Sequence, residues 1–320
     1  MRASLPDMAL GPLPPDELVV RVGVPPEAFP TPEERASVFT SVGLAAYEDI
    51  CSALPEGWSW EGKRVLDFGC GCGRILRWFL PHAEDGCELV ACDIHAPTIE
   101  WMRANYPPEV RFDANAHEPP LREPEASFDV IYAGSVFSHL TDWARWLLEM
   151  RRLLRPGGLL VASLHGRGFW PQGLAGSRGE AWDEDATGLL VEYYGASFED
   201  GGLGPAVYVS EWWLRAHWGR ALEIVRYEPE GFALPAGREG GQAWGVARRS
   251  GDEPRLEPER LLEPSGDERE LPAALRAQRL AYLEVQHHLD KVAELWREVQ
   301  KFPELWERIA ELEAELAGRP

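Results

Sequence analysis

Residues 65–74 have the sequence VLDFGCGCGR, and this stretch decides the fold. The apolar run Arg64–Phe68 is typical of a buried strand, and the glycine-rich turn of residues 69–73 follows it directly. A helix is expected to open at Arg74. Glycine lacks a Cβ atom, so the backbone of such a turn can approach a ligand closely. The stretch therefore predicts a strand, a ligand-binding loop and a helix, in that order.

The chain after this loop alternates short apolar runs with helical patterns. Further strands are expected at 88–92, 110–112, 128–133, 159–164, 222–227 and 242–247, and helices at 97–105, 143–154 and 210–218. This alternation is typical of a parallel sheet covered by helices on both faces. We therefore expect an α/β fold, a Rossmann-like seven-stranded mostly parallel sheet, with a C-terminal coiled-coil tail.

Four parts follow from these patterns. Residues 1–61 form an extended arm and a cap helix that starts after Thr31, and residues 62–249 form the main domain. Residues 250–270 are polar and contain proline, which is typical of a linker, and residues 271–320 are helical. Within the main domain, residues 166–206 are rich in glycine and aromatic side chains, and we expect an irregular insert there.

The C-terminal helix carries a coiled-coil pattern. Its side chains at 4-3-4-3 spacing are Leu271, Leu275, Gln278, Tyr282, Val285, Leu289, Val292, Trp296 and Val299. Pro303 interrupts the pattern, and Leu305, Ile309, Leu312 and Leu316 resume the same rhythm. Two explanations stay open: a helix docked on its own domain, or a coil that binds a second copy or a partner protein through residues 271–317. The number of heptads favours the second.

Composition limits the partners of the chain. The 320 residues carry a net charge of −21, so the surface repels phosphate backbones and anionic membranes, and a nucleic-acid substrate is disfavoured. No stretch approaches the roughly 20 apolar residues of a membrane span, and the first residues lack the apolar core of a signal peptide. We expect a cytoplasmic protein.

The five cysteines indicate reduced thiols. An odd count, with four of the five near predicted strands, does not fit a disulfide framework. The pair Cys70 and Cys72 is separated by one residue and has no second ligand pair, whereas zinc sites usually need wider spacing and more ligands. We expect no metal site.

The glycine loop has to be distinguished from a nicotinamide dinucleotide site. That site would place a third glycine at position 74, where this chain has Arg74. In addition, Asp67 at the end of the strand would repel a pyrophosphate but attract an ammonium group. The loop therefore favours a cationic ligand without phosphate, and a dehydrogenase is disfavoured.

Taken with the segments FDVIYAGSVFSHL (128–140) and LLRPGGLLVASL (153–164), the loop resembles the class I methyltransferases that depend on S-adenosylmethionine (SAM). The chain is most similar to the small-molecule branch, which includes ubiquinone-type and sugar or natural-product enzymes. The resemblance covers residues 62–165 and continues more weakly to 249. It implies SAM as cofactor and S-adenosylhomocysteine as product.

The resemblance also implies a set of cofactor-binding positions. Asp67 would hold the methionine amino group and Asp93, one βα unit later, the ribose hydroxyls. The other implied positions are the loop residues Gly69, Cys70, Gly71 and Gly73, the adenine neighbours Ile94, Asn115 and Ala116, and Ala133, Gly134 and Ser135 beneath the methionine. Phe39 and Tyr47 of the cap helix would help cover the cofactor.

Candidates for a general base follow the predicted strands. His139 and His165 lie after the fourth and fifth strands, at the carboxyl ends where open α/β sheets bind ligands. A structural histidine is an equally good explanation for His139. Further candidates are Glu192, Tyr193 and Tyr194 in the insert, which we expect to form a lid and acceptor site.

The sequence therefore predicts a SAM-dependent methyltransferase acting on a small-molecule or glycan acceptor, by O- or N-methylation. A sugar or polysaccharide precursor is the first choice of acceptor, and a natural product or lipid-like molecule is the second. The alternative is a SAM-binding scaffold that has lost catalysis and acts through its C-terminal coil.

Overall fold

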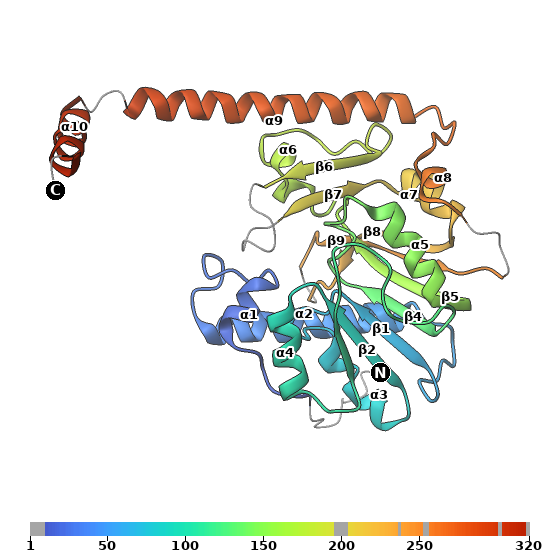
Figure 1. Cartoon of the computed structure of the whole chain (residues 1–320). Helices are drawn as coiled ribbons and strands as arrows, with labels where there is room; N and C mark the ends of the chain where they lie inside the picture. The colour runs from blue at the N-terminus through green and yellow to red at the C-terminus, as the bar shows by residue number, and fades with distance from the viewer. Residues whose placement is uncertain (1–9, 195–203, 236–237, 252–255, 300–302, 318–320) are drawn as a thin grey trace. The chain divides into compact units, whose positions relative to one another are not determined.

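The computed structural model describes residues 10–194, 204–235, 238–251, 256–299 and 303–317 (Figure 1). Phe198, one of the aromatic residues of the predicted insert, lies outside this part. The chain divides into two compact units, residues 1–274 and 275–320. In the described residues, none of the helices has the length and apolar character needed to span a bilayer.

The first unit is built on a seven-stranded sheet with the order β3-β2-β1-β4-β5-β9-β8. Its strands are β1 (Arg64–Phe68), β2 (Glu88–Asp93), β3 (Arg111–Ala114), β4 (Phe128–Ala133), β5 (Leu154–Leu164), β8 (Glu223–Phe232) and β9 (Gln242–Arg248). The first five are parallel, and β9 pairs antiparallel with both β5 and β8. The predicted Rossmann-like fold is confirmed, including the strand pair that completes the sheet.

Helices cover both faces of this sheet because its central strands are apolar on both sides. On one face pack α2 (Pro32–Ser52), α3 (Leu80–Glu84) and α4 (Ala96–Asn105), against a cluster that includes Val130 and Tyr132 of β4. On the other face pack α5 (Trp143–Leu153), α7 (Glu211–His217) and α8 (Pro258–Leu262), against a cluster that includes Ile131 and Ala133. Alternate residues of β4 thus serve opposite cores.

The start of α2 follows from its sequence. The Thr31 hydroxyl accepts the backbone N–H of Glu34, and the Glu34 carboxylate accepts the backbone N–H of Thr31, which together form a capping box. Proline at the first helical position adds a preset backbone angle. Further along, Gly43 lets the helix approach the glycine loop, because a Cβ atom there would lie 2.1 Å from the Arg74 carbonyl oxygen.

Two local predictions before β2 were wrong in detail. The predicted arm contains a short helix, α1 (Asp16–Arg21), which is held because the Arg35 guanidinium donates to the Asp16 carboxylate and to the backbone carbonyls of residues 29 and 30. After the glycine loop the chain makes turns and a 3-10 helix, η1 (Leu76–Trp78), before α3 begins. The α-helix expected at Arg74 therefore starts later.

The insert of residues 166–206 is more regular than its glycine content suggested. It contains η2 (Trp170–Gln172), α6 (Leu174–Ser177) and a hairpin of β6 (Leu189–Tyr193) and the first residues of β7 (Pro205–Val209). The hairpin is attached where β4 and β5 end, since the Val207 N–H donates to the Ser138 carbonyl and the Val209 N–H to the His165 carbonyl. The insert thus stands at the carboxyl edge of the sheet (Figure 1).

The segment predicted as a linker, residues 250–270, also contains structure. Its helix α8 carries Leu261, which is buried in the core beside α5. The His217 ring is bonded to the Leu261 carbonyl through Nδ1 and to the Glu270 carboxylate through Nε2. Glu270 begins the long helix α9 (Glu270–Val299), so the first turn of α9 belongs to the first unit.

The second unit contains the rest of α9 and α10 (Pro303–Ala317). The helices agree with the predicted helical tail. Pairing of this tail as a coiled coil stays a prediction.

Candidate functional site

Parallel pairing brings the ends of β1, β2, β3 and β4 to one edge of the sheet. The register pairs Phe68 with Cys92 and Asp93 with the last residue of β3. The glycine loop closes on this edge because the N–H groups of Gly69 and Cys70 both donate to the Cys92 carbonyl. The predicted acids and the predicted loop are therefore neighbours in space.

Asp67 is buried in the strand next to Tyr132 of β4. Burial raises the pKa of its carboxyl to about 8, and the Tyr132 hydroxyl opposes this shift. Its Oδ2 atom has no hydrogen-bond partner in the described structure. A buried carboxyl oxygen without a partner is costly, and a ligand ammonium at this position would satisfy it.

The glycine loop fits closely around its neighbours. Gly69, Gly71 and Gly73 have φ angles of +76°, +50° and +83°, which favour glycine. A Cβ atom at Gly69 would lie 2.3 Å from a methyl of Val136, just after β4. The loop is thus a cradle whose shape depends on the missing side chains.

The Asp93 carboxylate is fixed by backbone donors. Its Oδ2 accepts the N–H of Gly71 at 2.9 Å, and its Oδ1 accepts the N–H of His95 at 2.8 Å. A carboxylate oxygen can accept more than one hydrogen bond, so ligand hydroxyls can still be bound. Asp93 therefore links the glycine loop to the start of α4 and presents a rigid acceptor.

The predicted adenine neighbours lie at the ends of β2 and β3. The backbone N–H of Asn115 donates to the Asp93 carbonyl, and its side-chain amide N–H donates to the Ala116 carbonyl. The Asn115 Oδ1 atom has no partner in the part of the chain that the structure describes. Ile94 is 38% exposed, which leaves its apolar surface available to a flat ring. These contacts fit the acceptor role expected of Asn115.

A ring of hydrogen bonds that the sequence did not predict fixes the segment after β4. The Ser135 N–H donates to the Ser163 hydroxyl at 2.6 Å, and this hydroxyl donates to the Gln242 Oε1 atom at 2.6 Å. The Gln242 Nε2 atom donates back to the Ser135 hydroxyl at 2.8 Å. Ser135 has a φ of +62°, which is strained for a residue other than glycine. Ser163, a polar residue in an apolar strand, was the available signal.

The two predicted catalytic histidines lie together, with ring centroids 5.2 Å apart. His165 is buried and stacked on Phe169 at 4.0 Å, and burial lowers its pKa to about 2. The His139 Nδ1 atom donates to the Pro205 carbonyl at 2.7 Å, which puts the basic lone pair on Nε2. Burial also lowers the pKa of His139.

The other base candidates have different surroundings. Glu192 is buried and accepts the backbone N–H groups of Leu174 and Ala175 and the hydroxyl of Tyr194, so it caps α6. Tyr193 is 61% exposed. These contacts give Glu192 a structural task within the insert.

Tyr47 and Phe39, the two residues of the cap helix expected over the cofactor, pack in different clusters of the first unit. Tyr47 bonds to the His82 ring and packs edge-on against Phe79, within the core on the α3 side. Phe39 is fully buried with Cys72 of the glycine loop. Of the two residues expected over the cofactor, Phe39 is therefore the one packed against the loop.

The loop thiols act as donors. The Cys70 thiol contacts the Gly71 carbonyl and the Cys72 thiol the Leu18 carbonyl, and burial raises the pKa of Cys72 to about 12. All five cysteines are free. Among the described residues, His, Cys, Asp and Glu side chains form no group of three that could hold a metal ion.

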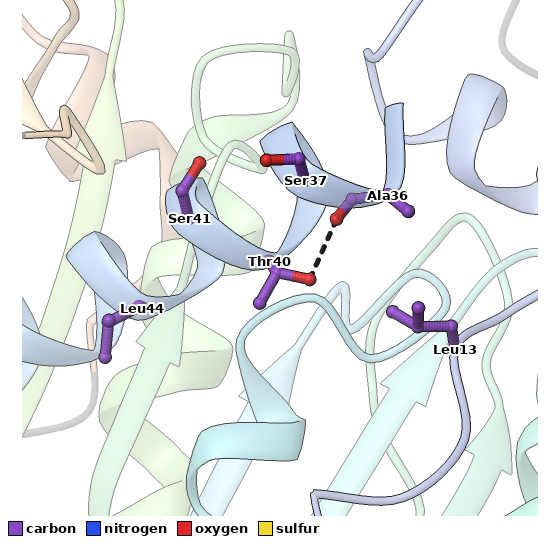
Figure 2. A pocket seen from close by; sticks show the side chains of 6 residues that line it. All are labelled: Leu13, Ala36, Ser37, Thr40, Ser41 and Leu44. Atoms are coloured by element: carbon purple, nitrogen blue, oxygen red, sulfur yellow. Dashed lines mark hydrogen bonds between the residues drawn. The ribbon is translucent and has the colours of Figure 1, made fainter. Parts of the chain in front are cut away.

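An open depression of about 470 Å³ is lined by α2 and by one residue of the N-terminal arm (Figure 2). Its lining consists of Leu13, Ala36, Ser37, Thr40, Ser41 and Leu44. The Thr40 hydroxyl donates to the Ala36 carbonyl of its own helix. None of these six residues is a predicted site residue, and the lining contains no ionisable group.

The chain is similar to known methyltransferases. Residues 66–160 match a family model described as a methyltransferase domain. A protein described as a "probable S-adenosylmethionine-dependent methyltransferase" from Mycolicibacterium smegmatis is 35% identical over 33% of this chain and 39% of its own length. A ubiquinone biosynthesis O-methyltransferase from Maricaulis maris is 28% identical over 32% of this chain and 41% of its own length.

A solved structure of a SAM-dependent methyltransferase from Mesorhizobium loti is also similar, with 19% identity and a TM-score of 0.45 over 64% of this chain and 98% of that one. The chain matches about two fifths of the length of the curated relatives named above. The matched part contains the glycine loop, Asp93 and the segment after β4.

Proposed function

From the premise that residues 66–160 form a methyltransferase domain of the class I, SAM-dependent type, we propose that this chain transfers a methyl group from SAM to a small-molecule or glycan acceptor. One observation carries the proposal. The buried Oδ2 atom of Asp67 lacks a partner in the described residues, beside a glycine loop that side chains would obstruct. An ammonium without a neighbouring phosphate is the ligand group that suits this position.

Five of the predicted positions have a binding task in this proposal. Asp67 binds the methionine ammonium, and Asp93, held by two backbone N–H groups, binds the ribose hydroxyls. Asn115 accepts the adenine amino group through Oδ1, and the exposed side of Ile94 packs on the adenine ring. The ring of hydrogen bonds among Ser135, Ser163 and Gln242 holds the backbone after β4 beneath the methionine.

The bound cofactor supplies a sulfonium methyl group with its own leaving group, so the chain mainly has to orient the acceptor in line with it. A hydroxyl acceptor also needs a base. We assign this task to His139, whose Nδ1–H group is already committed to the Pro205 carbonyl. Burial lowers the pKa of His165 to about 2, which makes its ring a weak proton acceptor.

For the acceptor we propose a sugar or polysaccharide precursor first and a natural product or lipid-like molecule second. The support is the position of the aromatic insert: its hairpin is bonded to the segments that follow β4 and β5. Aromatic side chains suit both sugar faces and flat rings, so a panel of acceptors has to separate the two. The helices of residues 271–317 would add association with a second copy or a partner protein.

Titration calorimetry with SAM and S-adenosylhomocysteine tests the cofactor assignment. We expect binding by the full-length chain, and loss of at least 10-fold in affinity after Asp93→Ala, because a ligand hydrogen bond to a charged group is removed. Asp85→Ala, an exposed aspartate before β2, is the matched control and should bind as the wild type does. Absence of binding by the wild type, or undiminished binding by Asp93→Ala, would refute the assignment.

Turnover of SAM with sugar and aromatic acceptors tests the reaction. With a hydroxyl acceptor, we expect His139→Gln to lower kcat by about 100-fold while the Kd for SAM stays unchanged. His165→Gln is the matched control, with thermal unfolding measured for both variants. An unchanged kcat for His139→Gln would remove His139 from the mechanism.

A further inference from the structure

The apolar seam of α9 is exposed along its whole length. Its apolar side chains are Leu271, Leu275, Tyr282, Val285, Leu289, Val292, Trp296 and Val299, with exposed fractions from 38% to 68%. Exposed apolar surface of this extent marks an interaction site. The helix spans 30 residues, or about 45 Å of seam.

The seam has two kinds of positions with different side-chain sizes. In heptad notation, the a positions are Leu275, Tyr282, Leu289 and Trp296, which are large. The d positions are Leu271, Gln278, Val285, Val292 and Val299, of which the last three are small and β-branched. In a parallel pair of identical helices, a faces a and d faces d, so tryptophan would face tryptophan and valine would face valine.

An antiparallel pair removes this mismatch, because each a residue then faces a d residue of the other helix. We propose that the seam of α9 binds α9 of a second copy of this chain in an antiparallel two-stranded coiled coil. This inference deepens the association proposed above for residues 271–317 and does not depend on the proposed methyl transfer.

The alternation of sizes also specifies the register. With Leu275 facing Val299 of the partner subunit, Tyr282 faces Val292 of the partner subunit and Leu289 faces Val285 of the partner subunit. Each of these three layers pairs a large side chain with a valine, which fills the core evenly.

The same register also provides a hydrogen-bond partner for the one polar residue of the seam. Gln278 faces Trp296 of the partner subunit, where the amide oxygen can accept the indole N–H. Buried tryptophan normally needs such a partner. The pairing therefore satisfies two polar groups that a parallel pair would leave facing their own kind.

Charge along α9 favours the same direction. In this register residues 275–286 lie opposite residues 288–299 of the second helix, and they carry Arg276, Arg279 and Glu284, for a net charge of +1. Residues 288–299 carry three acids and two bases, Asp290, Lys291, Glu294, Arg297 and Glu298, for a net charge of −1. An antiparallel pair sets the basic half beside the acidic half, whereas a parallel pair sets like beside like.

The positions beside the seam do not argue for a parallel dimer. Parallel pairs are commonly selected by opposite charges at the e and g positions. Here these positions from 274 to 295 hold Ala274, Arg279, Ala281, Gln286, His288, Ala293 and Leu295, with one permanent charge among them. Four of these seven residues are alanine or leucine, which widens the apolar seam.

Sedimentation of the full chain tests the assembly. We expect a mass of twice 35.9 kDa, about 72 kDa, and dissociation after Val292→Glu with at least a 10-fold rise in the dimer Kd. His287→Glu adds the same charge at an f position, on the side of the helix opposite the seam, and is the matched control. A monomer mass at 100 µM, or a mass of four chains, would overturn the proposal, as would a Val292→Glu dimer of unchanged Kd.

Disulfide trapping tests the direction. Residues 275 and 299 lie about 36 Å apart along one helix, so they meet only in an antiparallel pair. We expect Leu275→Cys mixed with Val299→Cys to form a covalent dimer on oxidation, while neither variant does so alone. The wild type, whose five cysteines are free and four of them buried, is the control for background oxidation. Covalent dimers of a single variant would show parallel pairing and overturn the proposal.

Discussion

The edge of the sheet and the seam of α9 use opposite physical means to bind. At the sheet edge, polar groups are buried and rigid: Asp93 is fixed by two backbone N–H groups, and Asp67 has a buried oxygen without a partner in the described residues. Along α9, apolar groups are exposed on a single helix. The first arrangement suits a small charged ligand, and the second suits another helix. Binding at the two regions should therefore respond to different changes.

The largest effect is expected at Asp67. We predict that Asp67→Asn lowers the affinity for SAM by about 100- to 1000-fold, because a buried ion pair with the ligand ammonium loses its charge. Calorimetry measures this, and the mass of the assembly serves as the internal control, since it should not change. Equal affinity of the variant and the wild type would mean that Asp67 does not bind the ammonium.

The pH dependence of binding should show the next effect. Burial raises the pKa of Asp67 to about 8, so below this pH the unbound protein holds the carboxyl protonated. The ligand ammonium favours the carboxylate, so binding releases a proton and the affinity falls as pH falls, by about 10-fold per unit between pH 7.5 and 6. Calorimetry in buffers of different ionisation enthalpy measures the released proton, and Asp67→Asn should abolish it. Proton uptake would contradict the assignment.

A smaller effect on SAM affinity is expected when the ring of hydrogen bonds among Ser135, Ser163 and Gln242 is broken. Replacing Gln242 by methionine keeps the volume but removes two hydrogen bonds, so the strained Ser135 backbone is held less firmly. We predict about a 10-fold loss of SAM affinity, together with about 1–2 kcal/mol of stability. Gln172→Met, at an exposed position, is the matched control. A variant that loses stability but keeps its affinity would give the ring a structural role alone.

The smallest effect is the sharpest test of the comparison. Val292→Glu should change the affinity for SAM by less than about twofold, even where it dissociates the chain, because no residue of the sheet-edge site comes from α9. Calorimetry of the variant at a concentration where it is monomeric measures this. A larger change would mean that the assembly itself takes part in cofactor binding.

Local patterns were sufficient for the centre of the fold. The glycine loop, the strands on either side and the acids at positions 67 and 93 could be predicted because each depends on residues a few positions apart. The insert was predicted less well: its glycines suggested an irregular segment, but β6 and β7 form a hairpin. This hairpin is attached through β7 to the carbonyls of Ser138 and His165, which are distant in sequence. The helix in the predicted linker was missed for a similar reason, because only tertiary contacts bury Leu261.

The sequence by itself determined the ligand class expected at the sheet edge, since a glycine loop next to an acid disfavours phosphate wherever it folds. It also determined the period of the α9 seam. Only the tertiary structure decided which polar side chains are hydrogen-bonded within the protein and which lack a partner among the described residues. Ser135, Ser163 and Gln242 are separated by 28 and 79 residues along the chain, and they meet because the sheet sets β4, β5 and β9 side by side. Burial, which shifts the pKa of Asp67 and His165 in opposite directions, arises from the same packing.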